Sequence, residues 1–112
     1  MNYAIVSTEY FDRQAKILSK KYRSLFDDLE SFKKELLKNP TMGNDLGDNF
    51  RKVRMAIASK NRGKSGGARV ITFTLLVDVE KTKIYLLTIY DKSKQDTISK
   101  EEIQLLKTVC GM

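Results

Sequence analysis

The apolar residues of this chain change their spacing once, from that of a helix to that of a strand. Between residues 11 and 36 they recur every three or four positions, which predicts helix with one buried stripe. Asn39-Pro40 ends this stripe, because proline disfavours helical backbone in the residue before it. From Phe50 onward the apolar residues alternate, as in a strand with one buried face. The chain therefore has a helical first part and a β-rich second part.

The helical part allows two arrangements. The stripe is long for one globular helix, so a helical hairpin broken near 21–24 and one bent helix both fit it. Ser24 with Asp27 resembles a capping box that would begin a second helix, and Ser7 or Thr8 can cap the first. Residues 1–7 are predicted to form a strand, and the turn formers of 40–49 predict a loop.

The β-rich part contains three consecutive predicted strands, which begin at Phe50 and continue at 69–77 and 83–90. Residues 61–67 and 78–83 are predicted turns. Ser99 with Glu102 forms a capping box for a last helix, ended by Gly111. Its expected apolar face comprises Ile103, Leu106 and Val109. We predict one α+β domain over 1–112, with an N-terminal strand and helical hairpin packed on an antiparallel sheet and a C-terminal helix.

Positive charge is confined to the second half of the chain. The net charge is +7, and basic and acidic residues balance over 1–50, so the whole excess lies in 51–112. No acidic residue occurs between Asp48 and Asp78. The basic residues within this interval are Arg51, Lys52, Arg54, Lys60, Arg62, Lys64 and Arg69. Such a concentration of charge predicts a polyanionic partner, of which RNA is one.

The residue types present exclude several kinds of chemistry. The chain has no histidine and one cysteine, Cys110, so histidine-based catalysis, histidine metal ligands and a cysteine-rich zinc site are excluded. No carboxylate cluster suited to magnesium is evident, and we expect no cofactor. A lone cysteine fits a reducing cytosol. With no signal peptide or membrane-spanning segment recognisable, we expect a cytoplasmic protein without a membrane partner.

The run Gly63-Lys64-Ser65 resembles the end of a phosphate-binding P-loop, but the pattern is incomplete. It requires glycine at position 58, where this chain has Ala58, and a helix directly after the run. The residues that follow are predicted to form a strand. An NTPase is therefore not favoured.

Cations from neighbouring strands are expected to converge. Lys52 and Arg54 share one face of their strand, and Arg69 begins the next strand of the same hairpin. The connecting loop carries Lys64, and Lys92 and Lys94 follow the last strand. Such a cluster can hold phosphates and stabilise a phosphorane-like transition state in which the RNA's own 2′-hydroxyl attacks. A solvated basic surface that only grips nucleic acid is the alternative.

Several segments resemble RelE/HigB-like toxins of type II toxin–antitoxin systems, and the HigB-type branch most closely. Their similarity covers nearly the whole chain, and the Gly-Lys-Ser-Gly-Gly-Ala-Arg run is its most specific part. The matching segments are 11–16 (Phe-Asp-Arg-Gln-Ala-Lys), 18–22 (Leu-Ser-Lys-Lys-Tyr), 51–57 (Arg-Lys-Val-Arg-Met-Ala-Ile), 63–71 (Gly-Lys-Ser-Gly-Gly-Ala-Arg-Val-Ile) and 89–94 (Ile-Tyr-Asp-Lys-Ser-Lys).

This resemblance implies a microbial-RNase-like fold and metal-independent cleavage of mRNA in the ribosomal A site. By the resemblance, the activity rests on Lys52, Arg54 and Arg69, with Lys92 or Lys94 contributing after the last strand. We expect Arg54 and Arg69 to contact the scissile phosphate, Lys52 to act as base or electrostatic aid, and Lys92 as proton donor. A tyrosine that assists catalysis in some members would fall near 97–98, where this chain has none. Lys52 is therefore the candidate base. The residues expected to hold flanking RNA are Lys60, Arg62, Lys64 and Lys94.

The resemblance also implies a partner, a cognate antitoxin, which in the HigB-type branch is usually a helix-turn-helix DNA-binding protein. Two other functions remain open at this point. ParE-like members of the same superfamily inhibit DNA gyrase, and a catalytically inactive member would only bind RNA. The basic strand face favours the ribonuclease, because ParE-like members generally lack that set of cations.

Overall fold

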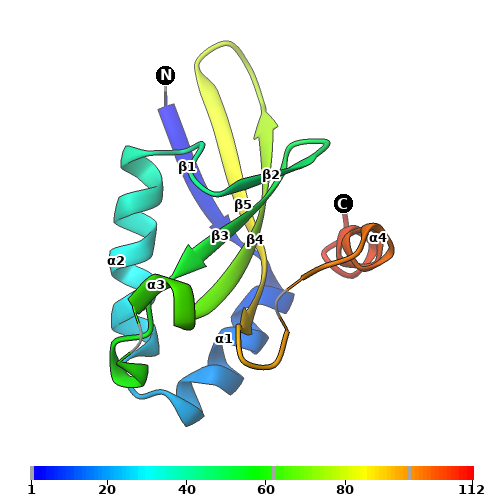
Figure 1. Ribbon diagram of the computed structural model, residues 1–112. Helices are drawn as coiled ribbons and strands as arrows, with labels where there is room; N and C mark the ends of the chain where they lie inside the picture. The colour runs from blue at the N-terminus through cyan, green and yellow to red at the C-terminus, as the bar shows by residue number, and fades with distance from the viewer. Residues whose placement is uncertain (1, 62, 96) are drawn as a thin grey trace.

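A five-stranded mixed sheet runs through the centre of the protein (Figure 1). The computed structural model describes residues 2–61, 63–95 and 97–112. The strands are β1 Asn2–Ser7, β2 Asn44–Gly47, β3 Phe50–Met55, β4 Ala68–Leu76 and β5 Lys81–Asp91. They lie in the order β1-β5-β4-β3-β2, with β1 parallel to β5 and all other neighbours antiparallel. The expected α+β architecture is confirmed, and its N-terminal strand joins the sheet as a parallel edge strand.

Two helices follow β1 as a hairpin, which decides between the two arrangements that the long apolar stripe allowed. They are α1 Glu9–Lys21 and α2 Leu25–Lys38. Thr8 caps α1 as expected, with its Oγ1 accepting a hydrogen bond from the Phe11 N–H at 3.1 Å.

The predicted capping box at the start of α2 is wrong. Ser24 precedes this helix, but its backbone is already helical (φ −82°, ψ −3°) and its side chain makes no capping bond. Its hydroxyl instead donates to the Asp28 carboxylate at 2.7 Å and accepts from the Ser59 N–H at 2.9 Å. Ser24 thus attaches the start of α2 to a distant segment of the chain.

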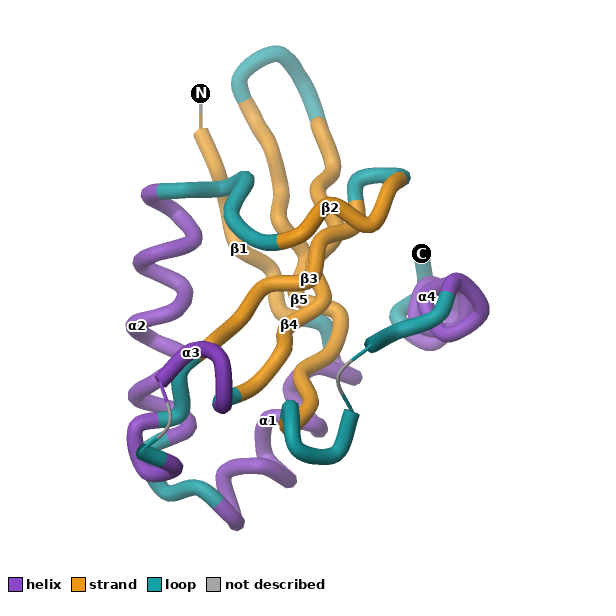
Figure 2. The backbone as a smooth tube through the Cα atoms, viewed as in Figure 1, coloured by secondary structure: helices purple, strands orange, loops and turns teal. Residues whose placement is uncertain are grey.

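The two faces of the sheet are covered by different helices (Figure 2). The α1–α2 hairpin packs on one face, and the last helix, α4 Lys100–Val109, packs on the other. The first core includes Phe11, Leu25, Leu29, Phe32 and Leu36 from the hairpin and Val53, Val70, Ile84 and Leu86 from the strands. The second includes Phe50, Ile71, Leu87, Ile103 and Leu106. Burial of these side chains supplies the main favourable free energy of folding.

The loop predicted over 40–49 contains the short edge strand β2. Its residues pair with the first half of β3, and Asp48 and Asn49 form the turn between them with positive φ values of 52° and 69°. Asparagine and aspartate adopt this conformation more readily than other non-glycine residues. The sequence therefore predicted the turn correctly. It did not predict β2, because none of the four residues of this strand has a β-branched side chain.

The predicted turn over 61–67 lies within a compact segment that links β3 to β4. This segment contains a 3-10 turn, η1 Ala58–Lys60, and a one-turn helix, α3 Gly63–Gly66. At its end Gly67 lies against β3, where an added Cβ would stand 2.1 Å from the Met55 carbonyl oxygen. Only glycine fits that contact. The strand β4 follows, so the P-loop pattern lacks its long helix, as expected.

The C-terminal helix α4 begins with the predicted capping box, in which both reciprocal hydrogen bonds of Ser99 and Glu102 are present. Gly111 ends it with a φ of 74°. Ile103 and Leu106 are buried as expected, but Val109 is 51% exposed, and the residue after it, Cys110, packs against the second core instead. Among the described residues, no helix combines the length and apolar character that a membrane-spanning segment requires.

Candidate functional site

Arg54 and Arg69 are direct partners across β3 and β4, and Arg69 is the direct partner of Tyr90 on β5. Directly opposed residues of neighbouring strands project from the same face of a sheet. Lys52 lies two residues before Arg54 on the same face. The expected placement of these three cations on one sheet face is therefore confirmed, and it is the face on which α4 packs.

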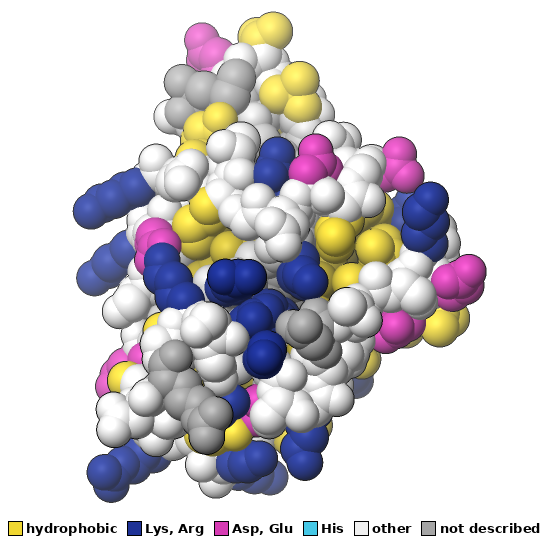
Figure 3. All heavy atoms as spheres, viewed as in Figure 1, with side chains coloured by type: hydrophobic (Ala, Val, Ile, Leu, Met, Phe, Trp, Pro, Cys, Tyr) yellow, Lys and Arg dark blue, Asp and Glu magenta, His cyan; other side chains and the backbone are white. Residues whose placement is uncertain are grey.

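Basic side chains gather on this face over β3 and the neighbouring ends of β4 and β5 (Figure 3). Acidic side chains lie mostly toward the margins of the same view. Arg54 is exposed and Lys52 is half-buried. Both line a groove of about 350 Å³ along β3, whose walls are Glu35, Met42, Gly43, Asn44, Lys52, Val53, Arg54 and Lys64. A groove with several cations in its wall is suited to a phosphodiester chain.

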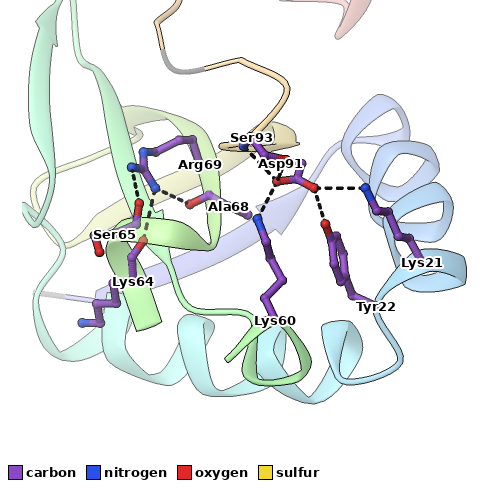
Figure 4. Close-up of polar contacts among 9 residues, drawn as sticks. All are labelled: Lys21, Tyr22, Lys60, Lys64, Ser65, Ala68, Arg69, Asp91 and Ser93. Carbon is purple, nitrogen blue, oxygen red and sulfur yellow. Dashed lines mark hydrogen bonds and ion pairs between the residues drawn. The ribbon is translucent and has the colours of Figure 1, made fainter. Parts of the chain in front are cut away.

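Arg69 lies beneath this surface. Its side chain is only 3% exposed, and its guanidinium donates to the carbonyl oxygens of Lys64 at 3.2 Å, Ser65 at 3.0 Å and Ala68 at 3.1 Å (Figure 4). Two of these acceptors belong to α3. In this conformation Arg69 therefore holds α3 against the start of β4. Its positive charge lies beneath the basic surface and adds to the potential there.

Lys64, on α3, is tied to the helical hairpin. Its ammonium forms an ion pair with the Glu35 carboxylate of α2, and both side chains are about half exposed. Glu35 also lines the groove with Lys52 and Arg54. Sequence reasoning did not identify Glu35 as a residue of this site. Its position on an amphipathic helix gave no signal, because only the packing of α2 beneath the edge of β3 brings it there.

Lys60, predicted to contact RNA, has a different environment. Its ammonium lies 2.7 Å from an Asp91 carboxylate oxygen, and its side chain is only 10% exposed. The structure therefore gives Lys60 an internal partner. The predicted RNA contact Arg62 lies outside the described residues.

Asp91 is the second residue that sequence reasoning missed. It is the last residue of β5, is 4% exposed, and accepts hydrogen bonds from Lys60, from the Tyr22 hydroxyl at 2.5 Å and from Ser93 (Figure 4). Burial acts to raise the pKa of the Asp91 carboxyl, but the hydrogen bonds from Lys60, Tyr22 and Ser93 outweigh it and hold that pKa well below its usual range. Asp91 is therefore an anion at neutral pH.

Lys92 and Lys94 bring a third basic segment to the site. The Lys92 N–H donates to the Gly67 carbonyl at 3.1 Å, so the turn after β5 lies beside the connection that leads into β4. The Lys92 side chain is half-buried and that of Lys94 is exposed. The expected approach of this turn to the Arg69 strand is thus observed.

The site has a basic character and no evident metal centre in the part of the chain that the structure describes. Within residues 2–61, 63–95 and 97–112, no three side chains among His, Cys, Asp and Glu come together as metal ligands would. The chemical groups offered to a ligand are ammonium and guanidinium groups, which bind phosphate oxygens by charge-assisted hydrogen bonds.

The chain matches a family model described as the RelE toxin of the RelE / RelB toxin–antitoxin system, over residues 4–112. This match extends from β1 to the end of α4 and includes every cation discussed above. Toxins of this kind are paired with an antitoxin and are generally ribonucleases. This protein belongs to the RelE toxin family.

Proposed function

We propose that this toxin is a ribosome-dependent endoribonuclease that cuts mRNA in the A site without a metal ion. The observation that carries the proposal is the alignment of Arg54 with Arg69 across β3 and β4, beside the groove that Lys52 also lines. An antitoxin partner follows from the family, and a helix-turn-helix protein is the kind we expect.

The reaction needs little from the protein beyond charge and proton transfer. The 2′-oxygen of one nucleotide attacks the adjacent phosphorus, the bond from phosphorus to the 5′-oxygen breaks, and a 2′,3′-cyclic phosphate and a 5′-hydroxyl result. Negative charge builds up on the phosphorane oxygens, where preorganised cations are most effective. One group must accept the 2′-hydroxyl proton and another must protonate the leaving oxygen.

The structure supports a division of these roles. Arg54 is exposed at the groove and is assigned to the scissile phosphate. Lys52 beside it is assigned as base or electrostatic aid, and Lys92 as proton donor. Arg69, being buried, acts in this proposal by positioning α3 and adding positive potential, instead of by direct phosphate contact as the sequence suggested. Lys64 and Lys94 would hold flanking RNA.

Induction in growing cells tests this proposal. Wild type, Arg54→Ala and Arg69→Ala are induced beside Arg13→Ala, a control in which an exposed arginine of α1 is removed. Growth arrest with mRNA cuts at A-site codons for wild type and Arg13→Ala, but not for the other two variants, is the expected result. Arrest with DNA damage and intact mRNA would contradict it and indicate gyrase inhibition.

A further inference from the structure

The Asp91 carboxylate connects three segments that are far apart in the chain. Tyr22 is the C-cap residue of α1, Lys60 is the last residue of η1, and Ser93 lies in the turn after β5. The three donors lie at 2.5, 2.7 and 2.8 Å from carboxylate oxygens, and the Lys60 ammonium is also 5.5 Å from the centre of the Tyr22 ring. One buried anion thus fixes their relative positions.

Two of these segments carry cations of the proposed RNA site. Lys60 precedes α3 in the chain by three residues, and α3 bears Lys64. On the other side, the main-chain carbonyl of Asp91 accepts from the Lys94 N–H at 3.0 Å and the Gln95 N–H at 3.2 Å, which closes the turn that bears Lys92. Asp91 therefore stands between the basic segment before β4 and the basic turn after β5 (Figure 4).

The η1 end of the first segment is also held from α2. The Asp28 carboxylate accepts from the Ala58 N–H at 3.0 Å, and Ser24 accepts from the Ser59 N–H. Lys60 is the next residue, and its bond to Asp91 links this anchored turn to the end of β5. Loss of the Asp91 charge would leave η1 bound to α2 and release it from β5.

We propose that Asp91 is a positioning residue of the proposed RNA site. It sets where Lys64 and Lys92 stand relative to Arg54, so that each of these groups meets the bound RNA without rearrangement. This inference rests on the proposed function. A displacement of about 1 Å of a positioned group can cost about a hundredfold in rate, so a loosened anchor acts on the chemical step more than on substrate capture.

Three variants separate this role from simple support of the fold. Asp91→Asn removes the charge with the same shape, and Tyr22→Phe removes one donor while the ring over Lys60 stays. Ile84→Ala is the matched control, because Ile84 is fully buried at the other end of β5 and its truncation destabilises the fold without touching the site. The conservative variant Asp91→Glu retains the charge.

The experiment measures kcat and KM for cleavage of a defined mRNA on programmed ribosomes, at a temperature where every variant is folded. We expect Asp91→Asn to lower kcat at least tenfold with KM within about threefold, Tyr22→Phe to lower kcat a few-fold, and Asp91→Glu to recover part of the loss. Ile84→Ala should keep the wild-type kcat.

Two results would overturn the inference while leaving the proposed function intact. One is a folded Asp91→Asn or Tyr22→Phe variant with the kcat of wild type. The other is an equal loss in Ile84→Ala at equal destabilisation, which would reduce Asp91 to a support of the fold. If wild type itself makes no cuts, the proposed function fails and the inference fails with it.

Discussion

Arg54 and Arg69 face each other in register across β3 and β4, yet Arg54 is exposed whereas Arg69 is 3% exposed and donates to three backbone carbonyls. Like charges directly opposed across two strands repel each other, and the three carbonyl acceptors of Arg69 offset part of that cost. The two arginines therefore have different roles. Arg54 is available at the surface, whereas Arg69 binds the backbone of α3 and the start of β4.

Removing the exposed arginine should separate activity from stability. Arg54→Ala is expected to reduce the cleavage rate by about a hundredfold, as for loss of one transition-state donor, while the free energy of unfolding changes by less than about 0.5 kcal/mol. Single-turnover cleavage and urea denaturation measure the two quantities. A variant that cuts at the wild-type rate would remove Arg54 from the proposed site.

The buried arginine should not tolerate lysine. Arg69→Lys keeps the charge, but an ammonium cannot reproduce the planar fork that reaches the carbonyls of Lys64, Ser65 and Ala68. We expect the free energy of unfolding to fall by about 1–3 kcal/mol, the cost of buried acceptors left without donors. Urea denaturation beside Arg54→Lys, where the same exchange is made at an exposed position, provides the comparison. Equal stability of Arg69→Lys and wild type would contradict the positioning role of Arg69.

Asp91 should make the free energy of unfolding depend on pH in the acidic range. Because its folded pKa lies well below that of an unfolded aspartate, about 3.9, it stabilises the fold fully above about pH 4. That contribution is lost as pH falls from there toward the folded pKa. Asp91→Asn should therefore lower the free energy of unfolding by about 3 kcal/mol at pH 7, and the difference from wild type should shrink below about pH 4. Denaturation curves at pH 7, 5 and 3 measure it, and a difference that stays constant down to pH 3 would contradict this linkage.

Gly67 should be irreplaceable for a steric reason. An alanine Cβ there would stand 2.1 Å from the Met55 carbonyl oxygen, so Gly67→Ala must displace β3 or α3 and is expected to destabilise the fold by at least about 3 kcal/mol. Gly47→Ala is the control, because no atom lies within 4 Å of its added Cβ and only its φ of 88° opposes the change, at about 1 kcal/mol. Thermal unfolding of both proteins compares them, and similar melting temperatures would refute the contact.

The candidate base can be tested against the carboxylate that shares its groove. Lys52→Met should slow cleavage at least about a hundredfold if Lys52 accepts the 2′-hydroxyl proton. Glu35→Gln removes the carboxylate of the groove, which could accept this proton in place of Lys52, and it also removes the ion-pair partner of Lys64. This variant should change the cleavage rate only a few-fold. The opposite ranking of the two rates would transfer the role of base to Glu35.

Local sequence signals predicted the parts of the fold that depend on local pattern. Thr8, the Ser99–Glu102 box and the alternation of Lys52 and Arg54 against Val53 each reflect interactions within a few residues. The strand β2 was missed because its residues have weak strand propensity and pair only because the turn at Asp48 returns the chain onto β3.

The basic composition of the site could be predicted, but not its internal connections. Charge and spacing selected Arg54, Lys64 and Lys92 as candidate site residues. The partners of Lys60 and Lys64 are Asp91 and Glu35, which lie 31 and 29 residues away in the chain. Such pairings depend on how α2 and β5 pack, and no local pattern encodes them.

The chemical identity of the cut ends shows whether the 2′-hydroxyl of the mRNA carried out the attack. Ribosomes programmed with a defined mRNA are incubated with wild-type toxin or with Arg54→Ala, and the ends of the fragments are mapped. Wild type is expected to yield fragments with a 2′,3′-cyclic phosphate on one side of the A-site cut and a 5′-hydroxyl on the other, and Arg54→Ala is expected to yield far fewer. Intact mRNA with wild type, or fragments that carry a 5′-phosphate, would contradict it.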